Sequence, residues 1–78
     1  MRTFEDTRGQ AWQAALLEGS YGQLWLVFSP MGGGELRQCP SPVPGRAEAQ
    51  AALASCTVVD LRAWLAAATP WDAAAAGG

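Results

Sequence analysis

Apolar and polar residues alternate along the first half of the chain, which is the pattern of half-buried β-strands. Residues 2–5 form the first such segment and residues 10–17 the second. The third runs from Gln23 to Ser29 and contains the most apolar run, Leu24-Trp25-Leu26-Val27-Phe28, and a short segment over residues 35–39 follows it. Turn residues separate these segments, so the pattern predicts a four-stranded antiparallel meander.

The first turn is predicted at Asp6-Thr7-Arg8-Gly9. Aspartate at the first position of a type I turn accepts a backbone hydrogen bond, and glycine at the fourth takes a positive φ without steric cost. Such a turn with a glycine bulge commonly closes a β-hairpin. Glycines within residues 18–22 and 30–34 predict the next two turns.

The second half of the chain predicts two short helices. Pro40, Pro42 and Pro44 exclude a helix interior and a central strand, so an extended connector is expected there. Residues 46–54 are rich in alanine and favour a first helix. Thr57 and Asp60 have the spacing of a capping box, which opens a second helix to about residue 68. Its apolar stripe comprises Val58, Leu61, Leu65 and Ala68, with Trp64 beside them.

Together these elements predict an α+β fold in the order ββββαα, with both helices packed on one face of the sheet. A chain of 78 residues fits one domain, which we expect to cover residues 1–71. Trp71 is expected to fold back onto the domain, and residues 72–78 are expected to form a disordered tail.

Strand alternation assigns the side chains to two faces of the sheet. If Leu16 lies opposite Leu24, one face carries an apolar set that forms the core under the helices: Phe4, Trp12, Leu16, Leu24, Leu26 and Phe28. The other face carries Gln13, Ala15, Leu17, Trp25 and Val27, with Trp25 over Ala15. A water-facing antiparallel face is normally polar, whereas this one is mixed.

The face around Trp25 has several interpretations. Clustered apolar exposure marks contact surfaces, so this face predicts a weak homodimer or a protein partner. Alternatively, the fourth strand, the glycine loop or Trp71 covers Trp25, or the sheet curls into a partly closed barrel. We therefore expect a non-catalytic interaction module. The alternative function is binding of a small ligand in an aromatic pocket near Trp12, Trp64 and Trp71, between sheet and helices.

The composition argues against catalysis. The chain contains no histidine and no lysine, which removes the usual general base and Schiff-base nucleophile. Cys39 and Cys56 do not form a CxxC motif, so neither a redox pair nor a zinc site is indicated. Arg37 near Cys39 is only a weak signal for a reactive thiol. Gly32-Gly33-Gly34 lacks the following helix and lysine of a phosphate loop. We expect no enzyme, no cofactor and no metal.

The charge of the chain argues against nucleic acid as a partner. The net charge is −2, and the five basic residues are arginines scattered along the sequence.

Charged residues make up 15% of the chain, against roughly 25% in ordinary soluble proteins. Low charge favours association, although a GC-rich coding sequence also accounts for the absence of lysine, asparagine and isoleucine.

Membrane association and export are not indicated. No apolar run approaches the roughly 18 residues that a membrane span needs. The residues after Arg2 do not form the apolar stretch of a signal peptide. We expect a cytoplasmic protein, in which both cysteines stay reduced.

Several aromatic, glycine and turn motifs stand out along this chain. They are the opening Phe4-x-Asp6-x-x-Gly9-x-x-Trp12, the turn Tyr21-Gly22, the strand end Leu26-Val27-Phe28, Arg37, and the stretch Leu61-Arg62-Ala63-Trp64-Leu65. In this combination the chain resembles a group of short bacterial proteins of unknown function, over residues 4 to about 71. The resemblance implies one small bacterial domain and no catalytic activity.

Overall fold

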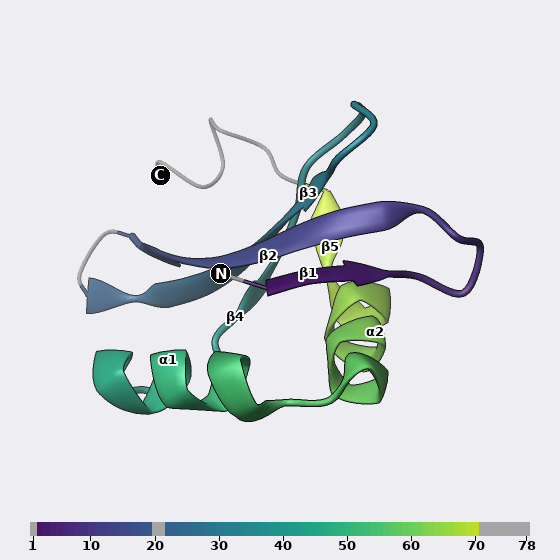
Figure 1. The fold of residues 1–78 in the computed structure, drawn as a ribbon. Helices are drawn as coiled ribbons and strands as arrows, with labels where there is room; N and C mark the ends of the chain where they lie inside the picture. Colours follow the sequence, from purple (N-terminus) through teal and green to yellow (C-terminus); the bar gives the residue numbers. More distant parts are fainter. Residues whose placement is uncertain (1, 20–21, 71–78) are drawn as a thin grey trace.

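The computed structural model describes residues 2–19 and 22–70, and it has an α+β fold (Figure 1). One antiparallel sheet has the strand order β1-β2-β3-β4-β5. Its strands are β1 (Arg2–Glu5), β2 (Ala11–Glu18), β3 (Leu24–Pro30), β4 (Arg37–Pro40) and β5 (Thr69–Pro70). The helices α1 (Arg46–Ser55) and α2 (Val58–Ala67) lie on the same side of the sheet. The predicted meander and helical layer are therefore present. Trp71 and the tail 72–78 lie outside the described residues.

The fifth strand was not predicted from the sequence. After α2 the chain runs antiparallel to β4, with Thr69 opposite Gln38 and Pro70 opposite Arg37. The pair Thr69-Pro70 indicates the end of a helix, but it also fits an edge strand. An edge strand pairs with only one neighbouring strand, so the missing N–H of a proline can face away from the sheet. β5 has only two residues, which is too short for a periodic signal.

The first hairpin closes as predicted. The Asp6 carbonyl accepts a hydrogen bond from the Gly9 N–H at 3.1 Å, and the Asp6 N–H donates to the Gln10 carbonyl at 2.9 Å. Gly9 has a φ of 83°, the left-handed region that favours glycine. Phe4 lies opposite Trp12 across this hairpin.

The second hairpin has a different register from the predicted one. Leu24 pairs with Glu18, and Leu16 pairs with Leu26 rather than with Leu24. Trp12 consequently lies opposite Pro30 instead of Phe28, and Trp25 lies opposite Leu17 instead of Ala15. The shift is two residues, and side chains repeat with a period of two, so every residue stays on its predicted face.

The core lies between the sheet and the helices. Phe4, Trp12, Leu26 and Phe28 are buried on this inner face, and the rings of Phe4 and Phe28 meet edge to face with centroids 6.1 Å apart. The helices contribute Leu53, Leu61 and Leu65 to the same core. Leu24 is also buried, as predicted, and Leu16 is half-buried against the cluster. Alternation therefore predicted the core face correctly.

The predicted capping box of α2 is present. The Thr57 side chain accepts a hydrogen bond from the Asp60 N–H at 3.2 Å, and the Asp60 carboxylate accepts one from the Thr57 N–H at 3.1 Å. Leu61, Leu65 and Ala68 are buried as expected. Val58 is exposed, contrary to the predicted stripe, and the first turn of α2 is the part of the helix farthest from the sheet.

A strand residue caps the end of α1. The last turn of α1 contains no basic residue of its own. Nη1 of Arg2 in β1 instead donates to the carbonyls of Leu53, Ala54 and Cys56 at 3.1, 2.9 and 3.0 Å. A cation at a helix C-terminus offsets the partial negative charge of the unpaired carbonyls. Arg2 thus fastens the helical layer to the edge of the sheet.

Candidate functional site

A network of three hydrogen bonds surrounds the carboxylate of Asp6. One carboxylate oxygen, Oδ1, accepts hydrogen bonds from the Arg8 and Gln10 backbone N–H groups at 2.8 and 2.9 Å. The other, Oδ2, accepts from Nε1 of Trp12 at 2.9 Å. The bond from Trp12 is the largest cause of a lowered pKa of the Asp6 carboxyl, and the two backbone bonds add to it. Asp6 therefore stays ionised and fixes both the turn and the indole ring.

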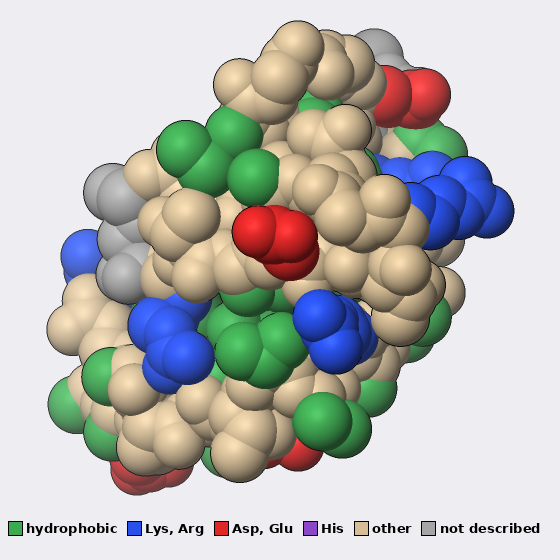
Figure 2. Space-filling view, turned by 45° about the vertical axis from the view of Figure 1, so that its right-hand side comes forward, with side chains coloured by type: hydrophobic (Ala, Val, Ile, Leu, Met, Phe, Trp, Pro, Cys, Tyr) green, Lys and Arg blue, Asp and Glu red, His purple; other side chains and the backbone are tan. Residues whose placement is uncertain are grey.

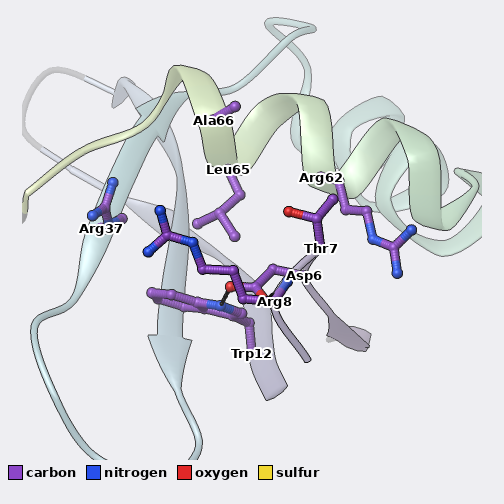
Figure 3. Close-up of a pocket in the computed structure, with 8 residues that line it drawn as sticks. All are labelled: Asp6, Thr7, Arg8, Trp12, Arg37, Arg62, Leu65 and Ala66. Carbon is purple, nitrogen blue, oxygen red and sulfur yellow. Dashed lines mark hydrogen bonds between the residues drawn. The ribbon is translucent and has the colours of Figure 1, made fainter. Parts of the chain in front are cut away.

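A cavity of about 320 Å³ opens beside this network (Figure 3). The turn after β1, strand β4 and helix α2 form its walls. It is lined by Asp6, Thr7, Arg8, Trp12, Arg37, Arg62, Leu65 and Ala66. Figure 3 shows Arg8 and Arg37 on one side of the cavity, with Leu65 above the indole ring of Trp12. An apolar floor with cationic groups at its rim is a feature of small-molecule sites.

Three of the five arginines line this cavity. Nε of Arg62 donates to the Glu5 carbonyl at 2.9 Å. Among residues 2–19 and 22–70, the ion pair is Arg46 with Glu18, at 2.9 Å and away from the cavity. Arg8 and Arg37 are exposed and form no salt bridge in these ranges, although the charge of Arg8 is among the causes that lower the pKa of Asp6. Figure 2 shows basic side chains on both sides of a small hydrophobic area, with an acidic side chain above it.

The residues of the predicted aromatic pocket do not all lie at this cavity. Trp12 lines the cavity, although it is only 8% exposed. Trp64 packs against the core and does not line the cavity, because the helical stripe directs Leu65 there instead. Trp71 lies outside the described residues. The arginines were interpreted as scattered, because nothing in their spacing reveals that the first turn, β4 and α2 meet at one end of the sheet.

The second candidate surface is the outer face of the sheet, opposite the helices. It carries the predicted set Gln13, Ala15, Leu17, Trp25 and Val27. Leu17 is 42% exposed, and the other four are half-buried. No helix of the described chain lies over this face (Figure 1). The outer face therefore carries the residues that the alternation assigned to it, and their apolar side chains are partly open.

The indole ring of Trp25 lies against the backbone of Gly19. A Cβ placed on Gly19 would lie 3.0 Å from Nε1 of Trp25, so the ring occupies the space that a side chain would need. Trp25 thus packs against Gly19 at the end of the β2–β3 hairpin, beside its partner Leu17. The outer face is less open at β4, because Gln38 is only 9% exposed there. Its Oε1 lacks a hydrogen-bond partner within the part of the chain that the structure describes.

The two cysteines are not activated. Both are free thiols. Cys39 is buried and Cys56 half-buried, and burial is the main reason that the pKa of each thiol is raised. A raised pKa keeps each group in the protonated, less nucleophilic form. Arg37 lines the cavity, and the pKa of Cys39 does not fall in its presence.

Residues 2–19 and 22–70 contain no cluster of three or more histidine, cysteine, aspartate or glutamate residues that could hold a metal ion. Within the same ranges, neither α1 nor α2 has the length and apolar character to cross a membrane. Protein-family models, curated proteins and solved structures contain no match to this chain. The resemblance to short bacterial proteins stays a prediction.

Proposed function

We propose that the chain is a non-catalytic interaction module whose outer sheet face binds a second copy of itself. The observation that supports this best is the apolar pair Leu17 and Trp25 on a sheet face that the helices leave open. Burying such a pair removes apolar surface from water, and a tryptophan contributes the largest area. The absence of histidine and lysine and the raised pKa values of the thiols support a role without catalysis.

The charge pattern of this face favours a second copy as the occupant. In a two-fold symmetric contact each patch meets itself, so a charged patch would repel its own image. The strands place neutral residues across the centre of the face, and Glu5 is an ionisable residue at its corner. Two neutral sheet faces can pack at about 10 Å, as in a β-sandwich.

The proposed contact is weak. A standard interface buries about 800 Å² on each partner, and a face of short strands offers less. A small cytoplasmic module with transient self-association fits this size, and the free thiols support the cytoplasmic location. The net charge of −2 supports the exclusion of nucleic acid as a partner.

Sedimentation velocity tests the proposal. We expect the wild type to dimerise between about 1 μM and about 1 mM, which corresponds to about −8 to −4 kcal/mol. Trp25→Ser and the milder Leu17→Ser should both stay monomeric while keeping the far-UV circular dichroism of the fold. Val59→Ser is the matched control, because Val59 is 71% exposed on α2, away from the sheet. A monomeric wild type throughout, or an equal loss in Val59→Ser, would contradict self-association through this face.

A second candidate function is binding of a small ligand, which the cavity beside Trp12 favours. Its volume of about 320 Å³ is at the lower end of the range of roughly 300–1,000 Å³ for ligand sites. This function uses the inner side of the sheet and does not require self-association.

A further inference from the structure

One end of the sheet carries more positive charge than the contacts that stabilise the fold require. Arg8 comes from the first turn, Arg37 from β4 and Arg62 from α2, and all three line one cavity. Like charges brought together repel one another and lower the stability of the folded chain. Arg2 and Arg46, by contrast, have clear structural partners, the end of α1 and Glu18. The three arginines at the cavity therefore have positive charge that is available to bind a ligand.

Asp6 provides the one carboxylate at the cavity, and this carboxylate already accepts hydrogen bonds from within the chain. Both oxygens of Asp6 accept hydrogen bonds, from the Arg8 and Gln10 backbones and from the Trp12 indole. None of these bonds uses the Arg8 guanidinium. Asp6 therefore orders the turn and the ring. Its charge attracts Arg8, but among the described residues no hydrogen bond holds the guanidinium group of Arg8 or Arg37, so their N–H donors are available to an external anion.

The guanidinium groups are placed differently around the cavity. Arg62 is tied to the Glu5 carbonyl and extends away from Arg37, so it lies at the rim. Arg8 and Arg37 lie on the opposite side of the cavity (Figure 3). A guanidinium group suits carboxylate and phosphate, because its N–H donors match the spacing of two of their oxygens.

The remaining wall of the cavity is apolar. Leu65 of α2 points toward Trp12 across it, and Ala66 also lines the cavity, so a flat hydrocarbon group has surfaces to contact. We propose that this cavity binds a small organic anion, a carboxylate or phosphate monoester joined to a flat apolar group. Arg8 and Arg37 bind the anionic group, and Trp12 and Leu65 contact the apolar part. The inference rests on the second candidate function, small-ligand binding, and is independent of self-association.

Titration by NMR and calorimetry tests this inference with phenyl phosphate, benzoate and benzyl alcohol. We expect the two anions to bind and to shift the arginine Nε signals of Arg8 and Arg37, while benzyl alcohol binds at least about tenfold more weakly, since one lost charge-assisted contact corresponds to a factor of that order. The comparison of phenyl phosphate with benzoate determines which anionic group the cavity prefers. Arg8→Gln and Arg37→Gln should each weaken anion binding about tenfold or more. Both side chains are exposed, so the variants should fold.

Arg46→Gln is the matched control, because it removes the same charge from an exposed residue outside the cavity. Its affinity for both anions should equal that of the wild type. An equal loss in Arg46→Gln would indicate attraction to net charge alone and would overturn the inference. If benzyl alcohol binds as tightly as the anions, the cavity is a ligand site but the anionic class is wrong. If none of the three compounds binds, small-ligand binding fails with it, and self-association is unaffected.

Discussion

The two faces of the sheet use the same strands, yet they differ in what covers them. The inner face lies under α1 and α2 and buries Phe4, Trp12, Leu26 and Phe28. Neither α1 nor α2 lies over the outer face, which holds half-buried side chains such as Trp25 and Val27 (Figure 1). Alternation determines which residues share a face, whereas the helices determine which face becomes the core. An apolar residue in a strand is therefore not by itself evidence of a core position.

Two neighbouring residues of β3 give the largest expected contrast between the faces. Phe28 is 0% exposed on the inner face, so Phe28→Ala should lower the free energy of unfolding by about 3–5 kcal/mol. Val27 is half-buried on the outer face, so Val27→Ala should cost only about 1 kcal/mol. Urea denaturation followed by circular dichroism measures both. Similar losses would mean that the outer face is a second core, and the comparison would fail.

The second-largest expected loss of stability comes from detaching the helical layer from the sheet. Arg2→Met removes the hydrogen bonds from β1 to the end of α1, and a charged hydrogen bond contributes about 1.5–3 kcal/mol. We expect a loss of about 2 kcal/mol and faster amide exchange in the last turn of α1. Arg46→Met is the control at the other end of α1, where an exposed ion pair contributes about 0–1 kcal/mol. Unchanged exchange in Arg2→Met would show that α1 is held by packing alone.

The smallest expected effect is a change in the acid dependence of stability. The pKa of Asp6 is lowered in the folded chain, so its contribution is complete above the ordinary aspartate pKa of about 3.9 and is lost as the pH falls through the lowered value. Asp6→Asn should flatten the decline of the urea midpoint over this acid range. Glu35→Gln removes an exposed carboxylate and controls for net charge. Parallel curves for wild type and Asp6→Asn would contradict the role of Asp6 in fixing Trp12.

Local signals in the sequence predicted the local structure well. The turn at Asp6 and the capping box of Thr57 depend on residues within four positions of one another, so their chemistry is visible in the sequence. The assignment of residues to the two faces also succeeded, because it needs only the alternation of odd and even positions along each strand. The predicted β2–β3 register was wrong by two residues, since alternation cannot distinguish registers that differ by an even number.

The cavity depends on long-range contacts and could not be predicted in the same way. Arg8, Arg37 and Arg62 belong to three separate elements, and only the packed fold brings them together. The chain offered one partial signal, the aspartate six residues before Trp12, which binds the indole N–H. The outer face was easier to find, because Leu17 and Trp25 belong to adjacent strands with a clear apolar alternation.

The two edge strands of the sheet are short, and this helps the chain to avoid aggregation. β1 has four residues and β5 has two, ending at a proline, so within the described chain each border of the sheet offers few free backbone groups for strand addition. Long, flat borders are the usual starting points of fibril growth, and short borders with proline resist it. A chain with only 15% charged residues has little electrostatic protection against such growth. The geometry of its borders supplies protection that its charge does not.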